Sequence, residues 1–362
     1  MAARLMEGSE AIAEGMMAAG CRFFAGYPMT PFTEVLEHMA RLLPGVGGDC
    51  VNAESELEAI GMAWGAAAAG SRAATGSVGQ GLSLMQESIS ELCRAQVPLV
   101  ILNMSRGQTD YFQATRGGGH GDYRHPVLAP ADAPEAAELI QLAFHLADTW
   151  RNPVMFYGDY YLAHVQESVA VAPLEFGPAP SKDWCVDGTR SGTGAARLVS
   201  PLGRSKDRSD GSAGYGEHLA FTAERIDAME AGITPMVESG FLEDAEFVVV
   251  SFGTAARYVR YVVGLLHDEG LPIGFVRPIT LWPFPSDTVA RAGEGARAVA
   301  VYELNKGQMV EDVRLAVNGR APVRFIGDLT LDMSGFGISP DYDVERLEER
   351  IRSAFTAQLS EV

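Results

Sequence analysis

The sequence predicts an α/β protein of two units, the first a largely parallel sheet with helices on both faces. Short apolar segments alternate with helix-patterned segments over residues 8–165, as they do in βαβ units. Gly, Pro or acidic residues mark several strand-to-helix junctions in this stretch, and open α/β sheets bind ligands at such junctions. The alternation stops at 172–215 and resumes near Asp244.

In the first unit, residue type and apolar spacing assign the elements in order. Ser9 is expected to cap the first helix, which ends at Gly20. Pro31 suits the first turn of the second helix. The predicted strands lie at 22–25, 50–53, 98–104 and 153–157. The predicted helices lie at 9–20, 32–43, 56–69, 82–94 and 134–150.

Residues 172–215 are rich in Pro, Gly, Ser and charged side chains, and they are predicted to be a linker or a mobile flap. A Pro-braced turn is expected at 277–285. The remaining helices are expected at 218–231, 253–267, 308–317 and 342–359. The remaining strands are expected at 246–251, 273–276, 298–302 and 323–326. The predicted domain boundaries are 1–171, 172–243 and 244–362.

Composition excludes several classes of function. The net charge is −19, from 47 acidic and 28 basic residues, which argues against a nucleic-acid partner. The acidity favours solubility, with docking of a basic partner as the alternative. The longest apolar runs, such as 97–102, are too short to span a membrane, and the N-terminus lacks the apolar stretch of a signal peptide. We therefore expect a cytoplasmic protein.

The cysteines Cys21, Cys50, Cys93 and Cys185 form no CxxC pair or ferredoxin-type run. Each is expected to be a small buried hydrophobic residue. We therefore expect no iron–sulfur cluster on this chain, and the sequence indicates no metal site.

Three junction segments could carry chemistry, and each has a structural alternative. In Tyr27-Pro28-Met29-Thr30-Pro31, Thr30 is either a ligand contact or a helix N-cap. Glu54, Glu56 and Glu58 lie near a helix start, where carboxylates also favour the helix dipole. Ala73-Ala74-Thr75-Gly76-Ser77-Val78-Gly79-Gln80-Gly81 forms a Gly-rich turn that opens a helix.

Two further candidates follow the buried strand at 98–104. Arg106 stands at its carboxyl end, where a guanidinium can clamp a carboxylate with two parallel hydrogen bonds. The alternative is an arginine in an exposed loop. His120 follows a glycine triplet in 111–123 and is either a proton shuttle or a loop imidazole bonded to backbone.

These segments resemble those of the thiamine-diphosphate (ThDP) binding α subunits of 2-oxoacid:ferredoxin oxidoreductases, most closely the branched-chain 2-oxoisovalerate and 2-oxoglutarate type. Residues 27–31 match the family's Tyr-Pro-Ile-Thr-Pro. Glu56 stands nine residues before Gly65, which opens a Gly-Ala-x-Ala-x-Gly stretch. Residues 111–123, 281–285 and 303–309 match further family segments. The resemblance implies a pyrimidine-type ThDP domain followed by an α/β domain like the C-terminal domain of transketolase. In this second domain of the chain, Trp282 and Phe284 are expected to be core or interface anchors.

The resemblance also implies roles for single residues. Glu56 would hydrogen-bond N1′ of the cofactor's aminopyrimidine ring and favour the imino tautomer, which takes the proton from C2 of the thiazolium. Thr30 and Arg106 would bind the carbonyl and carboxylate of a 2-oxo acid, and His120 would move a proton. The residues expected to bind the cofactor are Tyr27, Pro28, Glu56, Gly79 and Gln80.

The implied reaction converts a 2-oxo acid, CoA and oxidised ferredoxin into acyl-CoA, CO2 and reduced ferredoxin. No Gly-Asp-Gly with a following Asn occurs here. A β subunit is therefore expected to supply the diphosphate and Mg2+ site and an iron–sulfur cluster. Ferredoxin-like γ and δ subunits are further candidates, so the chain is expected to work in a hetero-oligomer.

The sequence departs from the family after Arg106-Gly107, where relatives carry a Gly- and Pro-rich insert and this chain is short. That segment lies near the active site in relatives, so the departure affects substrate choice. Two alternatives to the oxidoreductase remain open at this point. One is another ThDP-dependent lyase or transketolase-like half-enzyme, and the other is a non-catalytic scaffold subunit.

Overall fold

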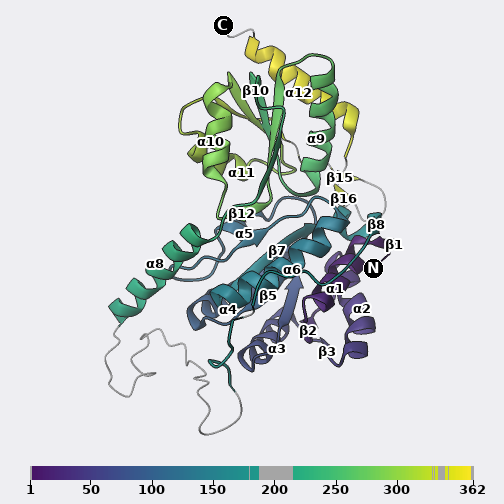
Figure 1. The fold of residues 1–362 in the computed structure, drawn as a ribbon, viewed down its shortest axis with the longest axis vertical. Helices are drawn as coiled ribbons and strands as arrows, with labels where there is room; N and C mark the ends of the chain where they lie inside the picture. Colours follow the sequence, from purple (N-terminus) through teal and green to yellow (C-terminus); the bar gives the residue numbers. More distant parts are fainter. Residues whose placement is uncertain are drawn as a thin grey trace.

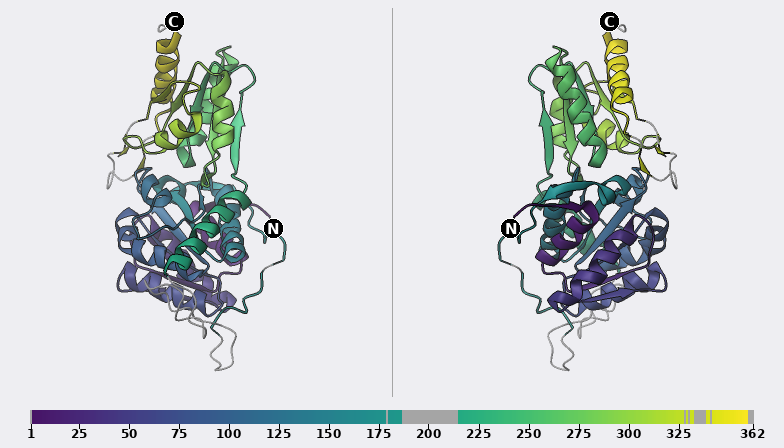
Figure 2. Two further views of the ribbon diagram at one scale, coloured as in Figure 1. Left: turned by 90° about the vertical axis from the view of Figure 1, so that its left-hand side faces the viewer. Right: turned by 90° about the vertical axis from the view of Figure 1, so that its right-hand side faces the viewer.

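The structure is a computed structural model that describes residues 2–178, 180–186, 215–327, 329, 331–332, 339–340 and 342–359. Two sheet-based units lie end to end (Figures 1 and 2). The first contains the N-terminal half of the chain, and the second carries the C-terminal helix at its far end. None of the helices described is long and apolar enough to cross a membrane.

The first sheet has seven strands in the order β12-β6-β7-β5-β4-β2-β3. Every neighbouring pair is parallel except β12 with β6, as the alternating pattern predicts. The strands are β2 (Phe23–Gly26), β3 (Asp49–Asn52), β4 (Ala73–Ser77), β5 (Leu99–Ser105), β6 (Val127–Leu128), β7 (Pro153–Asp159) and β12 (Thr280–Trp282).

Helices cover both faces of this sheet, which confirms the predicted layers. On one face α1 (Gly8–Ala18), α2 (Phe32–Leu42) and α6 (Ala133–Trp150) pack through buried aliphatic and aromatic side chains. On the other face lie α3 (Glu56–Ala68) and α4 (Gly79–Ala95). Helix α4 begins three residues earlier than predicted, since its first turn uses the glycines of the Gly-rich segment.

Two predicted helix caps are wrong because tertiary contacts replace them. Helix α1 begins at Gly8, and Ser9 lies inside it. The Gly8 N–H donates to the Val165 carbonyl at 3.0 Å, so no side-chain cap is needed. Pro31, rather than Thr30, is the N-cap residue of α2. The Met29 carbonyl accepts the first N–H groups of that helix instead.

The second unit has the sheet order β14-β13-β10-β11-β9, in which only β9 is antiparallel. Its strands are β9 (Val237–Gly240), β10 (Phe247–Val250), β11 (Ile273–Pro278), β13 (Ala298–Val301) and β14 (Val323–Phe325). Its helices are α9 (Gly253–Asp268), α10 (Ser286–Gly295), α11 (Met309–Val317) and α12 (Val344–Leu359). The Pro-braced segment 277–285 is more than a turn, because it contains β12, which joins the sheet of the first unit.

One apolar core runs from the first unit into the second, and it includes Tyr111, Phe252 and Leu281. Trp282 and Phe284 pack against this core, as expected for anchors. A partly buried ion pair also joins the units. The guanidinium of Arg277 on β11 bonds both carboxylate oxygens of Glu135 on α6, each at 2.8 Å.

The smaller elements cluster around the first unit. They are β1 (Arg4–Glu7), a 3-10 turn (Leu43–Val46), α5 (Tyr111–Thr115), α7 (Tyr160–His164), β8 (Gln166–Val169), α8 (Tyr215–Gly232), β15 (Leu331–Asp332) and β16 (Ser339–Pro340). Strand β1 pairs with β8.

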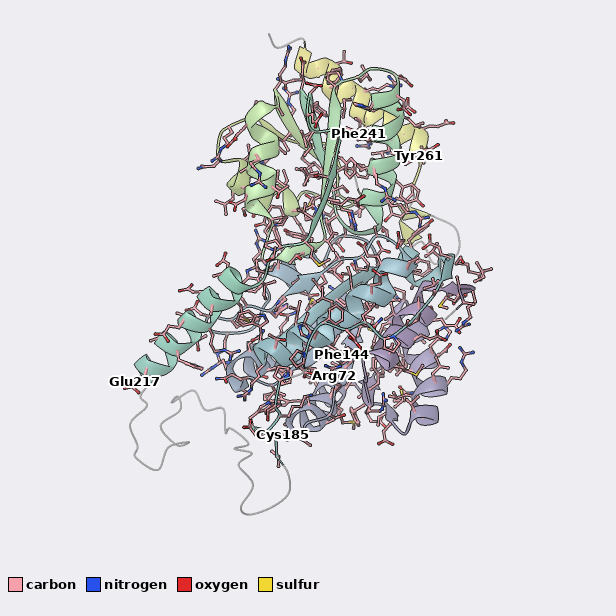
Figure 3. All side chains as sticks on the ribbon, in the orientation of Figure 1. Arg72, Phe144, Cys185, Glu217, Phe241 and Tyr261 are labelled. Carbon is pink, nitrogen blue, oxygen red and sulfur yellow. The ribbon has the colours of Figure 1, made fainter. Side chains whose placement is uncertain are left out.

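Part of the segment predicted as a linker or flap packs on the first unit. Lys182 lies 3.0 Å from Asp148 of α6, whose carboxylate also binds Arg72 at 2.8 Å. The N–H of Val186 donates to the Ala68 carbonyl at 2.9 Å. Figure 3 labels Arg72 and the neighbouring Cys185 in this region. The Gly- and Ser-rich run 203–212 lies outside the described residues.

Candidate active site

The predicted segments meet at one edge of the first sheet. Strands β5, β4, β2 and β3 lie side by side in that order and are parallel. Their carboxyl ends therefore face the same way, and each is followed by a segment with candidate residues. These segments contain Arg106, Gly79 and Gln80, Tyr27 to Thr30, and Glu56. The topology thus brings together residues as far apart in the sequence as Tyr27 and Arg106.

Glu56 is the first residue of α3, and its side chain is buried, with 5% exposed. Its Oε1 accepts a hydrogen bond of 3.1 Å from Oγ of Ser77, the last residue of β4. Gly81, in the first turn of α4, passes so close that a methyl group there would overlap the carboxyl group. No hydrogen bond within the described residues reaches Oε2. The carboxylate is fixed by one hydroxyl group and keeps an acceptor atom for a ligand.

Thr30 and Arg106 lie together, as neighbouring strands require. The Nε–H of Arg106 donates to the Thr30 carbonyl at 3.1 Å. Among the described residues, no hydrogen bond uses the terminal nitrogens of Arg106 or the Thr30 hydroxyl. Both groups therefore remain available to an anionic or carbonyl ligand. Tyr27, 38% exposed, and Pro28 precede Thr30 on the loop after β2.

Three of the predicted residues line one pocket of about 410 Å³. Its lining residues are Gly79, Gln80, Ser83, Arg106, Thr109, Asp110 and Gln113. The carboxyl group of Asp110 packs on Gly79, where a methyl group would come within 2.6 Å of Oδ1. Burial raises the pKa of Asp110, while the nearby charge of Arg106 opposes the rise. The pocket thus holds one fixed cation and one carboxyl group.

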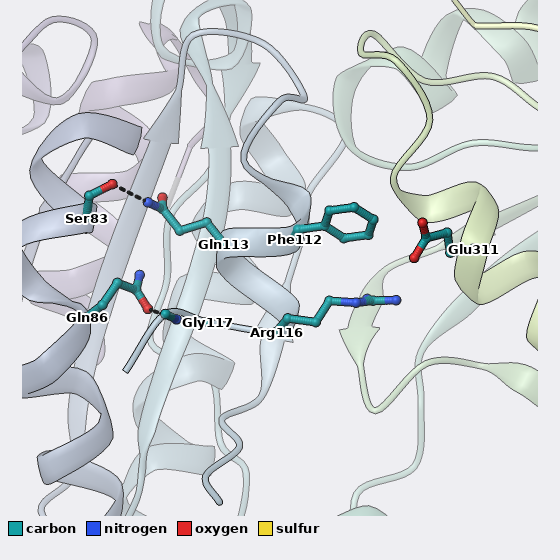
Figure 4. A pocket seen from close by; sticks show the side chains of 8 residues that line it. Ser83, Gln86, Phe112, Gln113, Arg116, Gly117 and Glu311 are labelled. Atoms are coloured by element: carbon teal, nitrogen blue, oxygen red, sulfur yellow. Dashed lines mark hydrogen bonds between the residues drawn. The ribbon is translucent and has the colours of Figure 1, made fainter. Parts of the chain in front are cut away.

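A second pocket of about 580 Å³ shares Ser83 and Gln113 with the first (Figure 4). Gln113 donates to Oγ of Ser83 at 2.8 Å and to the Gly79 carbonyl at 3.0 Å. Arg116 binds both carboxylate oxygens of Asp312 in the second unit, at 2.8 and 2.9 Å. The stretch 111–123 therefore folds against α4 and the second unit, and the charge of Arg116 is already neutralised.

The structure does not bring His120 to Glu56. The exposed His120 ring lies 2.5 Å from Oε1 of Glu91, about 15 Å along α4 from Gly81 at 1.5 Å per residue. Possible ligand atoms of Glu87, Glu91 and His120 lie within 4.8 Å of one another. However, Arg94 also lies 3.1 Å from the Glu91 carboxylate. The charge of that carboxylate is therefore already balanced by an arginine.

Glu54 and Glu58 are exposed, unlike Glu56. Ser55 caps α3 by accepting the Leu57 N–H at 3.2 Å, and its hydroxyl bonds the Glu58 carboxylate. This hydrogen bond lowers the pKa of Glu58. Glu58 thus supports the N-cap residue Ser55 at the start of α3.

Ser77, Gly81 and Asp110 also belong to the site, although none of them was predicted from the sequence. Ser77 and Gly81 lie in the Gly-rich segment predicted to open a helix, so the sequence did contain a signal for their neighbourhood. Their contact with Glu56 depends on β4 lying near the start of α3, which residue patterns do not specify. Asp110 lies in the short loop after Arg106, whose path depends on the second unit.

Comparisons with known proteins identify the family to which the chain is similar. The family described as "Pyruvate flavodoxin/ferredoxin oxidoreductase, thiamine diP-bdg" matches residues 14–183, and "Pyruvate:ferredoxin oxidoreductase core domain II" matches residues 245–333. Ketoisovalerate oxidoreductase subunit VorB of Methanothermobacter thermautotrophicus is 38% identical over 87% of this chain and 90% of its own length. 2-Oxoglutarate synthase subunit KorA of the same organism is 35% identical over 89% of this chain and 93% of its own length.

Two solved structures share the fold. The 2-oxoglutarate:ferredoxin oxidoreductase from Magnetococcus marinus, solved with 2-oxoglutarate, coenzyme A and succinyl-CoA bound, superposes with a TM-score of 0.80 at 25% identity. The match covers 97% of this chain but 65% of that chain, somewhat less than two thirds. A split-gene transketolase superposes with a TM-score of 0.54 at 14% identity over 96% of this chain and 97% of its own, which shows the fold alone. The chain belongs to the family of α-type subunits of 2-oxoacid:ferredoxin oxidoreductases, and its first unit is a ThDP-binding domain.

Proposed function

We propose that this chain supplies the pyrimidine half of a ThDP site and the carboxylate-binding arginine for a 2-oxo acid. The reaction is 2-oxo acid plus CoA plus two oxidised ferredoxins giving acyl-CoA, CO2, two reduced ferredoxins and a proton. The observation that carries the proposal is the buried Glu56 carboxylate, which accepts a 3.1 Å hydrogen bond from Ser77. It packs against Gly81, in the same first turn of α4 as Gly79 and Gln80, which line the pocket of Arg106.

The residues present fit the aminopyrimidine ring of ThDP. A buried carboxylate with an unused oxygen is the group that a ring N1′–H would bind. Glycine at position 81 leaves the space that any side chain would fill. ThDP, when bound, supplies the carbon nucleophile and electron sink for decarboxylation. Glu56 would hold the N1′ proton, while the Ser77 hydroxyl keeps the carboxylate oriented without solvent reorganisation.

Charge in the pocket favours a monocarboxylate 2-oxo acid. Arg106 is the cation among the lining residues, and Asp110 lines the same pocket close enough for the two charges to interact. Arg116, the next arginine along the chain, is committed to Asp312. Binding a second substrate carboxylate would leave it facing Asp110. We infer that 2-oxoisovalerate suits this chain's half of the site better than 2-oxoglutarate.

A partner subunit would complete the site, since the diphosphate and Mg2+ motif is absent from the sequence. The helices that start at the site present apolar side chains to solvent: Leu57 (52% exposed) and Met62 (41%) on α3 and Leu84 (51%) on α4. Within the part of the chain that the structure describes, no other side chain or neighbouring segment comes within 4 Å of the Cβ positions of Gly61 and Gly65 on α3. This surface suits close packing by the β subunit, which would carry Mg2+ and an iron–sulfur cluster.

Reconstitution tests the proposal. The chain is combined with a candidate β subunit that carries a diphosphate and Mg2+ motif, and viologen reduction is followed with CoA and either 2-oxoisovalerate or 2-oxoglutarate. The proposal expects CoA-dependent turnover with a higher kcat/KM for 2-oxoisovalerate. CoA-independent decarboxylation would indicate a lyase. ThDP binding without turnover of either acid would indicate a scaffold role.

A further inference from the structure

The segment from Arg106 to Arg116 has two sides with different surroundings. One side lines the pocket through Arg106, Thr109, Asp110 and Gln113. The other side faces the second unit. The loop is short. Each residue that lines the pocket is therefore only a few residues along the chain from a residue that is hydrogen-bonded to the second unit.

Gln108 fastens the loop at its start. Its side chain is buried, with 1% exposed. The amide donates to the Phe252 carbonyl at 2.7 Å and accepts the Leu304 N–H at 2.9 Å. Its own carbonyl accepts from the Asn305 amide at 2.8 Å. All three of these hydrogen bonds therefore connect Gln108 to the second unit.

Gln308 fastens the loop on both sides of Asp110. Its Nε2 donates to the Thr109 carbonyl at 2.7 Å, and its Oε1 accepts the Phe112 N–H at 2.8 Å. Both partners are main-chain atoms, so one side-chain amide fixes the backbone path of the turn. That path determines where the carboxyl group of Asp110 and the side chain of Thr109 enter the pocket.

The second unit holds Gln308 rigidly. The buried Glu303 carboxylate accepts the Gln308 N–H at 3.0 Å, together with the Met309 and Val310 N–H groups at 2.8 and 3.1 Å. These bonds anchor the start of α11 next to the loop. A rigid support of this kind can position a pocket without touching its ligand.

We propose that Gln308 is a positioning residue of the substrate pocket, through which the second unit sets the affinity for the 2-oxo acid. The inference rests on the proposed function, because the pocket must bind that acid. It assigns to the second unit a role in substrate affinity. Gln308 supports the loop that follows Arg106 and takes no direct part in the reaction.

The test compares variants in the assembled complex with 2-oxoisovalerate. Gln308→Ala removes both hydrogen bonds to the loop. Gln308→Glu keeps the side-chain length and the acceptor for Phe112, but it cannot donate to Thr109. Leu315→Ala is the control, because Leu315 is 78% exposed on the same helix. KM, kcat, ThDP affinity and thermal unfolding are measured for all variants.

We expect Gln308→Ala and Gln308→Glu to raise KM on the order of tenfold, with kcat and ThDP affinity within about twofold of wild type. The control should match wild type. Unchanged KM with a lower kcat or melting temperature would show a purely structural role and overturn the inference. A wild-type complex that turns over no 2-oxo acid would overturn the proposed function, and the inference with it. Turnover with unchanged KM in both Gln308 variants would overturn the inference alone.

Discussion

Gly81→Ala should impair catalysis by displacing the Glu56 carboxylate. An alanine methyl carbon at position 81 would lie 2.7 Å from Cδ of Glu56 and also overlap the Ser77 hydroxyl. Carbon atoms normally approach to about 3.5–4.0 Å, so the carboxyl group must retreat by about 1 Å. A displacement of that size costs about 10²-fold in rate when it affects a catalytic geometry. Helix α4 itself should tolerate alanine, because alanine favours the helix by about 1 kcal/mol over glycine.

The assay is CoA-dependent viologen reduction by the reconstituted complex, with thermal unfolding measured in parallel. Gly264→Ala is the matched control, since Gly264 lies in α9 and, beyond the backbone of its own helix, none of the described residues comes within 4 Å of its Cβ position. We expect kcat to fall about 10²-fold in Gly81→Ala and to stay at the wild-type value in Gly264→Ala. Wild-type kcat in a correctly folded Gly81→Ala complex would refute the claim that the position of the Glu56 carboxylate matters.

Three further predictions follow from the same structure. Arg106→Lys keeps the charge but loses the planar fork, so kcat/KM for the 2-oxo acid should fall about ten- to a hundredfold while ThDP affinity stays constant. Calorimetry should detect no submicromolar ThDP binding to the isolated chain, because the diphosphate motif is absent. Burial raises the pKa of Asp159 to about 6, so the folded protein keeps a proton that the unfolded chain releases above about pH 4. The free energy of unfolding should therefore fall between about pH 4 and 6, and Asp159→Asn should flatten that change in urea titrations.

Local patterns were sufficient to predict the long elements. Helices α2, α3 and α6 and strands β5 and β7 have apolar periods or buried runs that stand out without any tertiary information. The short elements depend on contacts between distant segments. Strand β12 is three residues long and exists because Thr280 and Trp282 pair with Leu128 and Val127. Pro283 beside it indicated a turn, and no periodicity can form over so few residues.

The candidate site could be predicted only in part, because some of its contacts also join segments that are distant in the sequence. Glu56 and Arg106 follow strands, and their positions at strand ends were visible in the sequence. The hydrogen bond from Ser77 to Glu56 was not, because it depends on the strand order. The position of His120, away from Glu56, also could not be predicted from the sequence. Its loop follows α5, a five-residue helix (Tyr111–Thr115) that tertiary bonds from Gln308 and Asp312 hold in place.

The central claim is that Glu56 holds the N1′ proton of ThDP, and C2 proton exchange of bound ThDP tests it most directly. Exchange is followed by NMR in the assembled complex for Glu56→Gln, with Glu54→Gln and Glu58→Gln as controls. Glutamine keeps the shape and the helix propensity but cannot act as the anionic acceptor. We expect Glu56→Gln to slow exchange by about 10²–10³-fold while the complex still assembles. The controls should exchange at the wild-type rate, with melting temperatures close to that of the wild type, because exposed carboxylates at a helix start contribute little to stability. Wild-type exchange in Glu56→Gln, or a collapse in Glu54→Gln instead, would contradict the assignment.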